Sequence, residues 1–311
     1  MAPTFAEATA VEAKDSHTYH VNFHPEWCIG SVPHGGVVTS ALLRVAALHF
    51  RTTLASQNQP HTMTVHVEFV RRTQTGPATV AVRDVKLGRQ TSTIHVTLTQ
   101  NGREEVVAYI TNANLDTESG VSLETGWSLQ PPPPPRPADF ARLGAEGSNE
   151  HWAELKNRPF SKFRAAMNHV RMFLPRGGRT RPNLVEEWVR LESGERFTNE
   201  SIGFVSDAWP QLLEGFEGEK KKKKDEEGGQ KSWQWYPTLV LNLDVKKALP
   251  PEGVEWLFVR LEAKQVRNGR QDYEIVILDE TGEIVALSHH VAMVLSGEKN
   301  LAKRRTGKSK I

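Results

Sequence analysis

Residues 35–50 read Gly-Gly-Val-Val-Thr-Ser-Ala-Leu-Leu-Arg-Val-Ala-Ala-Leu-His-Phe, and this stretch decides the fold. It consists largely of good helix formers and is apolar on nearly every side, which is typical of a helix buried in a protein core. The pattern changes over residues 62–114, where β-branched side chains alternate with polar ones and Asn101-Gly102 marks a tight hairpin turn. This region therefore predicts one buried helix followed by several antiparallel strands.

The helix-then-strands unit occurs twice in the chain. Gly88-Arg89-Gln90 returns as Gly269-Arg270-Gln271, and Val106-Val107-Ala108 returns as Ile284-Val285-Ala286, in the same order and at nearly the same spacing. The second copy opens at Gly203-Phe204-Val205-Ser206-Asp207. An internal repeat of this length predicts a fused pseudo-dimer, in which a site at the junction need use only one copy.

Composition excludes several classes of protein. The 311-residue chain carries 39 basic and 37 acidic residues, so its net charge of +2 gives no reason to expect a nucleic-acid partner. Its single cysteine, Cys28, excludes an internal disulfide and is interpreted as a small buried apolar residue rather than a nucleophile. No run approaches the roughly 18 apolar residues of a membrane-spanning helix, so no membrane span is expected. The N-terminus lacks the apolar core of a signal peptide.

Two unusual segments divide the chain. Five prolines at 131–135 open a polar surface linker, in which short helices are expected near 138–144 and 149–156. Five lysines at 220–224 are flanked by acidic residues, which favours a loop inserted between helix and sheet over a polybasic membrane patch. The expected organisation is an N-terminal domain at 1–130, a Pro-rich linker at 131–164, a C-terminal domain at 165–300 with a charged insertion at 217–232, and a basic tail at 301–311.

Short motifs in both halves resemble those of one enzyme family. In the first half they include Pro33-His34-Gly35-Gly36-Val37-Val38 and Val67-Glu68-Phe69-Val70-Arg71, and in the second half Glu187-Trp188-Val189-Arg190. With the repeated motifs above, they resemble the type-II acyl-CoA thioesterases and, more distantly, the wider thioesterase-like superfamily found in fungi. The resemblance covers residues 20–120 and 165–297. It implies an α+β double hotdog fold, in which two tandem units each wrap an antiparallel β-sheet around a central α-helix.

The resemblance also implies a catalytic site. That family hydrolyses acyl-CoA thioesters with an Asp, a Thr and a Gln that position and activate water. The Asp matches Asp207, which we expect at the start of a second central helix within Ser201–Phe216, and the Thr matches Thr238 at the opening of a strand. His290 stands where the family has Gln, so the third position departs from the pattern. The expected substrate-binding residues are His34, Gly35 and Gly36.

These residue types suit thioester hydrolysis, which needs an aimed water, a base and a donor for the developing oxyanion. Asp207 can take the water proton, and the Thr238 hydroxyl can hold the water. His290 either donates a hydrogen bond, as the amide would, or titrates near the ordinary histidine pKa of about 6.5 and acts as a base. The structural alternatives are a helix cap for Asp207, an ordinary strand threonine for Thr238 and a packed histidine for His290.

The glycine pair before the first helix has two interpretations. Gly35 and Gly36 either bring backbone N–H groups to the substrate carbonyl or serve close helix–sheet packing. In the first copy the position that corresponds to Asp207 falls near His34, where there is no acid. We therefore predict one working site per chain.

Other chemistries lack their motifs. The chain has no Gly-x-Ser-x-Gly elbow and no phosphate-binding glycine loop. Neither a metal nor a cofactor is expected, because metal-ligand spacing with acids or thiols is lacking around the scattered His24, His34, His61, His66 and His95. The preferred function is acyl-CoA hydrolysis. The alternatives are release of an acyl or polyketide chain from a carrier protein, and acyl-CoA binding without catalysis.

The last three residues suggest a cellular address. Ser309-Lys310-Ile311 resembles the Ser-Lys-Leu tripeptide that the peroxisomal import receptor binds, with Ile in place of Leu. We therefore expect this receptor as a partner and the peroxisome as the location, with the cytoplasm otherwise. The alternative is a basic tail that ends in Ile by chance. The sequence leaves open whether the fused pair associates with further copies of itself.

Overall fold

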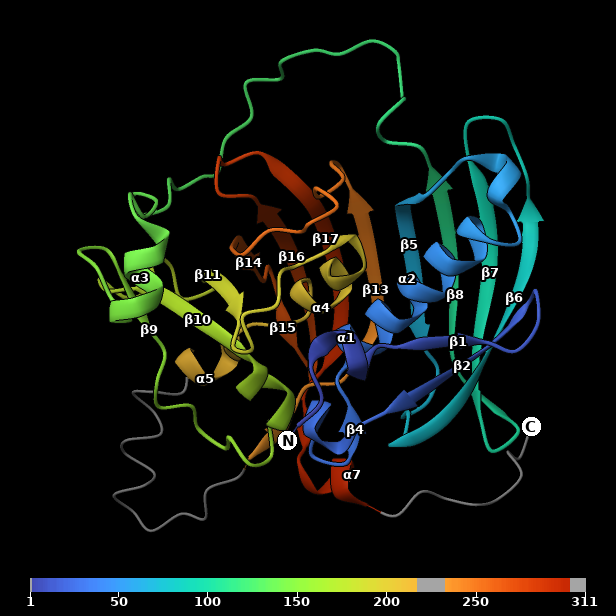
Figure 1. The fold of residues 1–311 in the computed structure, drawn as a ribbon. Helices are drawn as coiled ribbons and strands as arrows, with labels where there is room; N and C mark the ends of the chain where they lie inside the picture. The colour runs from blue at the N-terminus through green and yellow to red at the C-terminus, as the bar shows by residue number, and fades with distance from the viewer. Residues whose placement is uncertain (1, 217–232, 303–311) are drawn as a thin grey trace.

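The computed structural model describes residues 2–216 and 233–302, so the expected charged insertion and most of the basic tail lie outside the described residues. Its main feature is a 14-stranded sheet that curves around a long helix (Figure 1). All the strand pairs of this sheet are antiparallel, and both halves of the chain contribute strands to it. The architecture is therefore α+β, as the sequence predicts.

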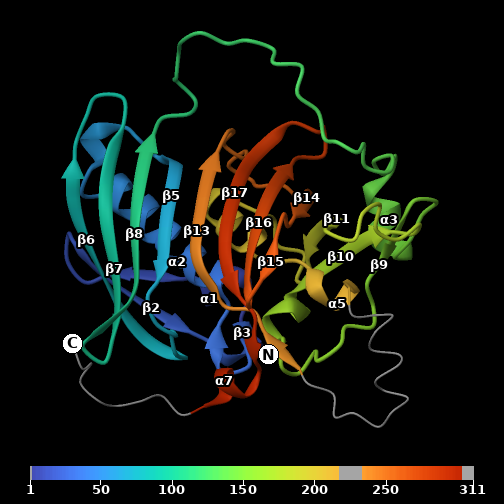
Figure 2. The same ribbon diagram turned by 180° about the vertical axis from the view of Figure 1, so that it is seen from behind.

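The strand order follows the two sequence copies. It runs β1-β2-β6-β7-β8-β5 through the first half and β13-β17-β16-β14-β11-β10-β9 through the second, with β15 paired to β16. The halves join where β5 pairs with β13, so that Val67 lies opposite Leu241 (Figure 2). The first-half strands are β1 Val11–Ala13, β2 Thr18–Phe23, β5 His61–Phe69, β6 Gly76–Lys86, β7 Ser92–Gln100 and β8 Arg103–Ala113. The second-half strands are β9 Trp152–Glu154, β10 Val170–Pro175, β11 Leu184–Leu191, β13 Thr238–Val245, β14 Leu257–Glu262, β15 Val266–Arg267, β16 Arg270–Leu278 and β17 Ile284–Met293.

Short elements complete the fold. Two small pairs stand apart from the main sheet. They are β3 Cys28–Ile29 with β4 Val32–Pro33, and β12 Gln234–Trp235 with β18 Leu295–Ser296. The α-helices are α1 Phe5–Ala8, α2 Gly35–Arg51, α3 Phe140–Glu146, α4 Ile202–Val205, α5 Leu212–Phe216 and α7 Glu298–Leu301, and 3-10 turns span Pro25–Trp27, Ala55–Gln57, Ala165–His169 and Asn199–Ser201. No helix in the described part of the chain is both long and apolar enough to cross a membrane.

The long helix α2 is the buried helix that the sequence predicts. Most of its 17 residues are buried, and eight of them belong to one large core cluster shared by both halves. Its first turn touches α4, since a Cβ added to Gly36 would lie 2.8 Å from the Gly203 carbonyl oxygen. A Cβ added to Gly203 would lie 2.9 Å from the Ser40 nitrogen. Glycine at both positions therefore lets the backbones of α2 and α4 meet.

The second central helix is much shorter than the sequence predicts. Within Ser201–Phe216 the chain forms the single turn α4, which ends at Val205, and becomes helical again only at α5. Pro210 accounts for the interruption, because proline has no N–H for the helix and disfavours helical geometry in the residue before it. The expectation that Asp207 starts a helix is therefore wrong, since Asp207 follows the end of α4.

The Pro-rich segment contributes to a second core. The prediction of a helix near 149–156 is wrong, because residues 152–154 form β9, an edge strand paired with β10. Asn149 sets the preceding turn by accepting hydrogen bonds from the backbone N–H groups of His151 and Trp152. The helix expected near 138–144 corresponds to α3. Together α3, β9 and the sheet enclose a mainly aromatic cluster of Leu143, Trp152, Phe173, Trp188, Trp256, Phe258 and Leu278.

Candidate active site

A pocket of about 390 Å³ opens at the junction of the two halves, beside the first turn of α2. This volume lies in the range of small-molecule sites, about 300–1,000 Å³. Its walls come from β4, the end of β5, the start of β13 and the segment that follows α4. The apolar lining includes Ile29, Val32, Phe69, Phe163, Met167, Trp209, Trp235, Leu239 and Leu295. An acyl chain is the kind of group that such a lining accommodates.

Asp207 lies in the wall of this pocket, with a side chain only 10% exposed. Its Oδ2 accepts a hydrogen bond from the backbone N–H of Gly36 at 2.8 Å, and its Oδ1 accepts one from the Thr238 hydroxyl at 3.3 Å. The carboxylate therefore sits at the N-terminus of α2, where the partial positive charge of the helix favours an anion. The helix that supports Asp207 thus belongs to the other half of the chain.

Burial raises the pKa of Asp207 above its ordinary value. The Gly36 N–H and the Thr238 hydroxyl each oppose this rise by favouring the ionised form. Burial is the larger effect because the carboxylate has lost most of its water. A carboxylate whose pKa is raised is a stronger base than an ordinary aspartate, which suits proton transfer from water.

Thr238 owes its position to an irregularity at the start of β13. It pairs with Ala292 of β17, and the register then shifts before Val240. Such bulges redirect a side chain relative to the regular pleat of a strand. Here the Thr238 hydroxyl points to Asp207, and Thr238 also lines the pocket.

His290 is fully buried on β17, with its Nδ1 atom 3.7 Å from Asp207 Oδ1. Its Nε2 lies 3.0 Å from the Ser288 hydroxyl, and that hydroxyl donates its hydrogen to the Asn242 carbonyl at 2.5 Å. The Ser288 oxygen therefore accepts from Nε2–H, which leaves only a lone pair on Nδ1. Burial lowers the pKa of His290 to about 3, so the ring is neutral near pH 7. Its Nδ1 is thus a buried acceptor with no hydrogen-bond partner in the described chain.

The three residues expected to bind substrate lie around the same carboxylate. His34 is buried and precedes α2, and its Nδ1 lies 3.6 Å from Asp207 Oδ2 and accepts from the Gly36 N–H at 3.1 Å. Burial lowers the pKa of His34. The Gly36 N–H is therefore shared by His34 and Asp207, while Gly35 lines the pocket. A Cβ on Gly35 would lie 2.8 Å from Asp207 Oδ2, so glycine is what lets the carboxylate approach.

Three further residues at this site were not singled out by the sequence. Trp209 packs edge-on against Tyr273 at 5.5 Å between ring centroids and tilts against His290 at 5.3 Å. Tyr273 is the β16 partner of His290 in register and lines the pocket. Within the part of the chain that the structure describes, the Tyr273 hydroxyl and the Gln271 amide are buried and have no hydrogen-bond partner. The alternation of side chains along β16 could have predicted that Gln271 and Tyr273 lie on the core face. It could not have predicted that they lie near Asp207.

Comparison with known proteins identifies the family. Residues 23–113 match the acyl-CoA thioesterase N-terminal domain, and residues 130–294 match the acyl-CoA thioesterase C-terminal domain. The chain belongs to the acyl-CoA thioesterase family. It is therefore a thioester hydrolase, and the family resemblance drawn from the sequence is confirmed.

Relatives of this thioesterase match nearly its whole length. The thioesterase-like protein TwmA of Talaromyces wortmannii is 39% identical over 341 residues, which cover 98% of this chain and 96% of TwmA. Among solved structures, a candidate thioesterase II from Thermobifida fusca has a TM-score of 0.71 at 21% identity, covering 94% of this chain and 99% of its own. Acyl-CoA thioesterase II TesB2 from Mycobacterium marinum has a TM-score of 0.59 at 15% identity, covering 98% and 99%. These likenesses confirm the double hotdog fold.

The pocket of this thioesterase has a cationic rim formed by Arg71, Arg72 and Lys299. Arg71 donates to the Glu104 carbonyl, and Arg72 donates to carbonyls at the start of the C-terminal segment, including that of Asn300 at 3.0 Å. Carbonyls are neutral, so these contacts leave the positive charges in place. Within residues 2–216 and 233–302, none of the three forms an ion pair with a carboxylate. Arg164 also lines the pocket, but it is paired with Glu214.

Proposed function

We propose that this thioesterase hydrolyses acyl-CoA to a free acid and CoA, with Asp207 as the base. One observation supports the proposal above the others: a nearly buried carboxylate faces an apolar pocket and is held from two sides, by the Gly36 N–H and the Thr238 hydroxyl. A base held in this way is aimed before the substrate arrives. The acyl chain would occupy the apolar lining, and the CoA phosphates would meet the cations of the rim.

The reaction needs one water and no other co-reactant. Water attacks the thioester carbonyl carbon and forms the new C–O bond, while its proton passes to Asp207. The tetrahedral intermediate collapses, the C–S bond breaks, and the thiolate of CoA takes the proton back from Asp207. Thr238 positions the water through its hydroxyl. Gly35 exposes the first turn of α2 to the pocket. The partial positive charge of this turn would stabilise the negative charge that develops on the carbonyl oxygen.

His290 acts through Asp207 rather than on the substrate. Before proton transfer, His290 Nδ1 and Asp207 Oδ1 are two acceptors 3.7 Å apart, so their lone pairs oppose each other. Once Asp207 takes the proton, its hydroxyl can donate to Nδ1, which closes the separation toward hydrogen-bond length. The neutral imidazole would therefore stabilise the protonated form of the base. An amide oxygen in the family Gln could accept the same hydrogen.

Thiol release from acyl-CoAs of several chain lengths tests this function directly. We expect Asp207→Asn to lower kcat by about 10²- to 10⁴-fold, the usual contribution of a general base. Asp244→Asn serves as the matched control, since Asp244 is an exposed acid on β13 that pairs with Lys246. Normal activity of Asp207→Asn would overturn the site assignment. Absence of hydrolysis by the wild-type protein would instead favour the binding role.

A second comparison separates CoA from carrier-protein substrates. Arg71→Ala should raise KM for acyl-CoA and leave acyl-pantetheine hydrolysis unchanged, because only CoA carries the nucleotide phosphates. If acyl-pantetheine and acyl-CoA are hydrolysed equally well and Arg71→Ala affects neither, the rim does not bind nucleotide. That result would favour release of a chain from a carrier protein, the alternative that the sequence leaves open.

A further inference from the structure

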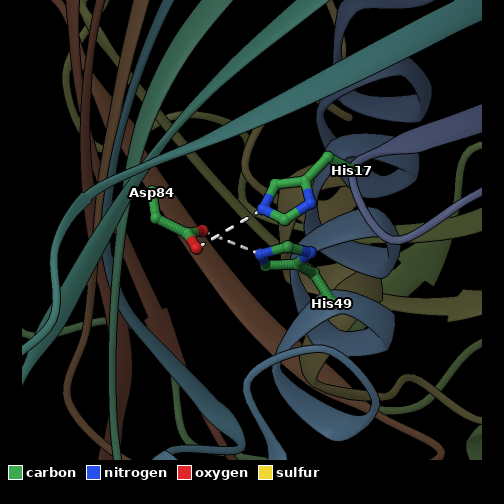
Figure 3. Close-up of side chains that lie close together, drawn as sticks. All are labelled: His17, His49 and Asp84. Carbon is green, nitrogen blue, oxygen red and sulfur yellow. Dashed lines mark hydrogen bonds and ion pairs between the residues drawn. The ribbon is translucent and has the colours of Figure 1, made fainter.

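Three potential metal ligands meet on the first half of the molecule, apart from the pocket. His17 comes from the turn between β1 and β2, His49 from the last turn of α2 and Asp84 from β6 (Figure 3). Their ligand atoms all lie within 4.8 Å of one another, and this is the one such group found in the described chain. Spacing along the chain does not indicate the cluster, because Asp84 lies 35 residues from His49 and 67 from His17.

The separations match the first shell of a zinc ion. His49 Nε2 lies 2.9 Å from Asp84 Oδ1, and His17 Nε2 lies 3.4 Å from Asp84 Oδ2. Two ligands of a tetrahedral zinc, each about 2.0–2.2 Å from the metal, are about 3.4 Å apart. The three ligand atoms all lie within 4.8 Å of one another, so side-chain rotations could bring them to coordination distance around one ion. Three protein ligands with a water in the fourth position make a familiar zinc set.

Hydrogen bonds on the far side of each ring orient the Nε2 atoms. His17 Nδ1 lies 2.8 Å from the Ser16 hydroxyl, and His49 Nδ1 lies 3.1 Å from the Ser16 carbonyl and 2.8 Å from the Tyr19 hydroxyl. Metal-binding histidines almost always engage their second nitrogen in this way, which fixes the tautomer and the ring direction. When the Tyr19 hydroxyl donates its hydrogen to the Ser16 carbonyl, the proton of the neutral His49 ring lies on Nδ1, which then donates. The Nε2 lone pair of His49 then faces the Asp84 carboxylate.

In this tautomer the Nε2 lone pair of His49 and the carboxylate oxygens of Asp84 can both bind a divalent cation. Calcium and magnesium prefer sites made of oxygen ligands, whereas imidazole suits zinc and its neighbours. His49 is fully buried and Asp84 is 25% exposed, while His17 is 43% exposed. Two ligands are therefore anchored, and the third lies at the surface, where an ion can enter.

We propose that His17, His49 and Asp84 bind one zinc ion that ties the β1–β2 turn to α2 and β6. The site is independent of acyl-CoA hydrolysis. His34 and His49 lie at opposite ends of α2, on the order of 20 Å apart at 1.5 Å per residue. Zinc bound here touches none of the residues around Asp207.

Calorimetric titration of Zn²⁺ into the chelator-treated full-length protein tests the proposal. We expect one saturable site, which His17→Gln weakens at least about tenfold. His20→Gln is the matched control, because His20 lies nearby on β2 but outside the cluster. Zinc should raise the unfolding temperature of the wild-type protein and of the control, but not that of His17→Gln. The rate of acyl-CoA hydrolysis at a fixed temperature should stay unchanged.

Two results would overturn the zinc site. One is no saturable uptake, which would leave the cluster as a hydrogen-bonded His–Asp network. The other is equal affinity of His17→Gln and His20→Gln, which would place the zinc elsewhere. Asp84→Asn provides a second variant that keeps the side-chain size and should also weaken binding. None of these results depends on whether the protein hydrolyses acyl-CoA.

Discussion

At the scale of single residues, His290 differs from the family amide in one chemical respect. An amide both donates and accepts, whereas the neutral His290 ring has already committed its only N–H to Ser288. What remains toward Asp207 is an acceptor. The donor role that the sequence left open for His290 does not fit this network, and titration near pH 6.5 does not fit a pKa of about 3.

The pH dependence of kcat/KM should therefore report Asp207 alone on its acid side. Activity requires the carboxylate, so it should fall as the pH falls through the pKa of Asp207. Because burial raises that pKa, the acid limb should lie above the ordinary aspartate value of about 3.9. We expect His290→Gln to retain this limb, since the amide oxygen can still accept from protonated Asp207. The measurement is kcat/KM from about pH 4 to about pH 9.

His290→Leu provides the contrasting variant. It removes the acceptor that stabilises protonated Asp207, so the pKa of Asp207 should fall and the acid limb should move to lower pH. A purely structural role for His290 would reduce activity without moving the limb. Loss of an acid limb near pH 6–7 in His290→Gln would show instead that the imidazole titrates during catalysis.

At the scale of elements, β11 carries two neighbouring glutamates whose surroundings are opposite. Glu186 is buried but forms an ion pair with Arg260. Glu187 is fully buried, and neither of its carboxylate oxygens has a hydrogen-bond partner in the described chain. Burial raises the pKa of Glu187 well above its ordinary value, with Arg158 opposing this only in part.

Glu187→Gln should stabilise the protein, and more so at higher pH. A raised pKa means that the native state holds a proton which the unfolded state releases, so the free energy of unfolding falls as pH rises above about 4.5. The glutamine variant does not titrate at this position, so its free energy of unfolding does not fall for this reason. Urea unfolding should show little difference between variant and wild type near pH 4, and a growing advantage of the variant toward pH 8.

Glu186→Gln is the matched control on the same strand. It leaves Arg260 buried without its charge partner, which typically costs about 3–5 kcal/mol, so this variant should be destabilised. If the two substitutions change the free energy of unfolding in opposite directions, the difference comes from the partners of the two glutamates rather than from β11 itself. A Glu187→Gln variant that is less stable at every pH would contradict the unpaired state of Glu187.

The same scale shows what the sequence could predict. Strand positions were predictable, because alternation and turn residues are local and the repeat supplies each pattern twice. The short α4 was harder to predict, since Ser201–Phe216 contains helix formers and Pro210 alone interrupts them. In the site, resemblance placed Asp207 and Thr238, but the support of Asp207 by α2 depends on contacts across the halves. The direction of the His290 hydrogen bond likewise depends on Ser288 and Asn242.

At the scale of the whole molecule, the two copies have diverged where they meet. His34 of the first copy and Asp207 of the second face each other across the junction, with His34 Nδ1 3.6 Å from Asp207 Oδ2. The counterpart of His290 in the first copy is Asn112, counted from the shared Val-Val-Ala and Ile-Val-Ala motifs. The Asn112 amide donates to the Gln59 carbonyl and accepts from Thr62, so it already serves the structure. This asymmetry supports one working site per chain.

The last prediction concerns where the whole chain acts. Ser309, Lys310 and Ile311 lie outside the described residues, so only their chemistry supports import: a small hydroxyl residue, a cation and a branched aliphatic end group, as in Ser-Lys-Leu. We propose that the peroxisomal import receptor binds this tripeptide. A fluorescent protein fused in front of the full chain should appear in puncta that coincide with a peroxisomal marker. Deleting the three residues should make it diffuse, whereas Ile311→Leu should preserve the puncta. Puncta that survive the deletion would show that the tripeptide is not needed for peroxisomal localisation.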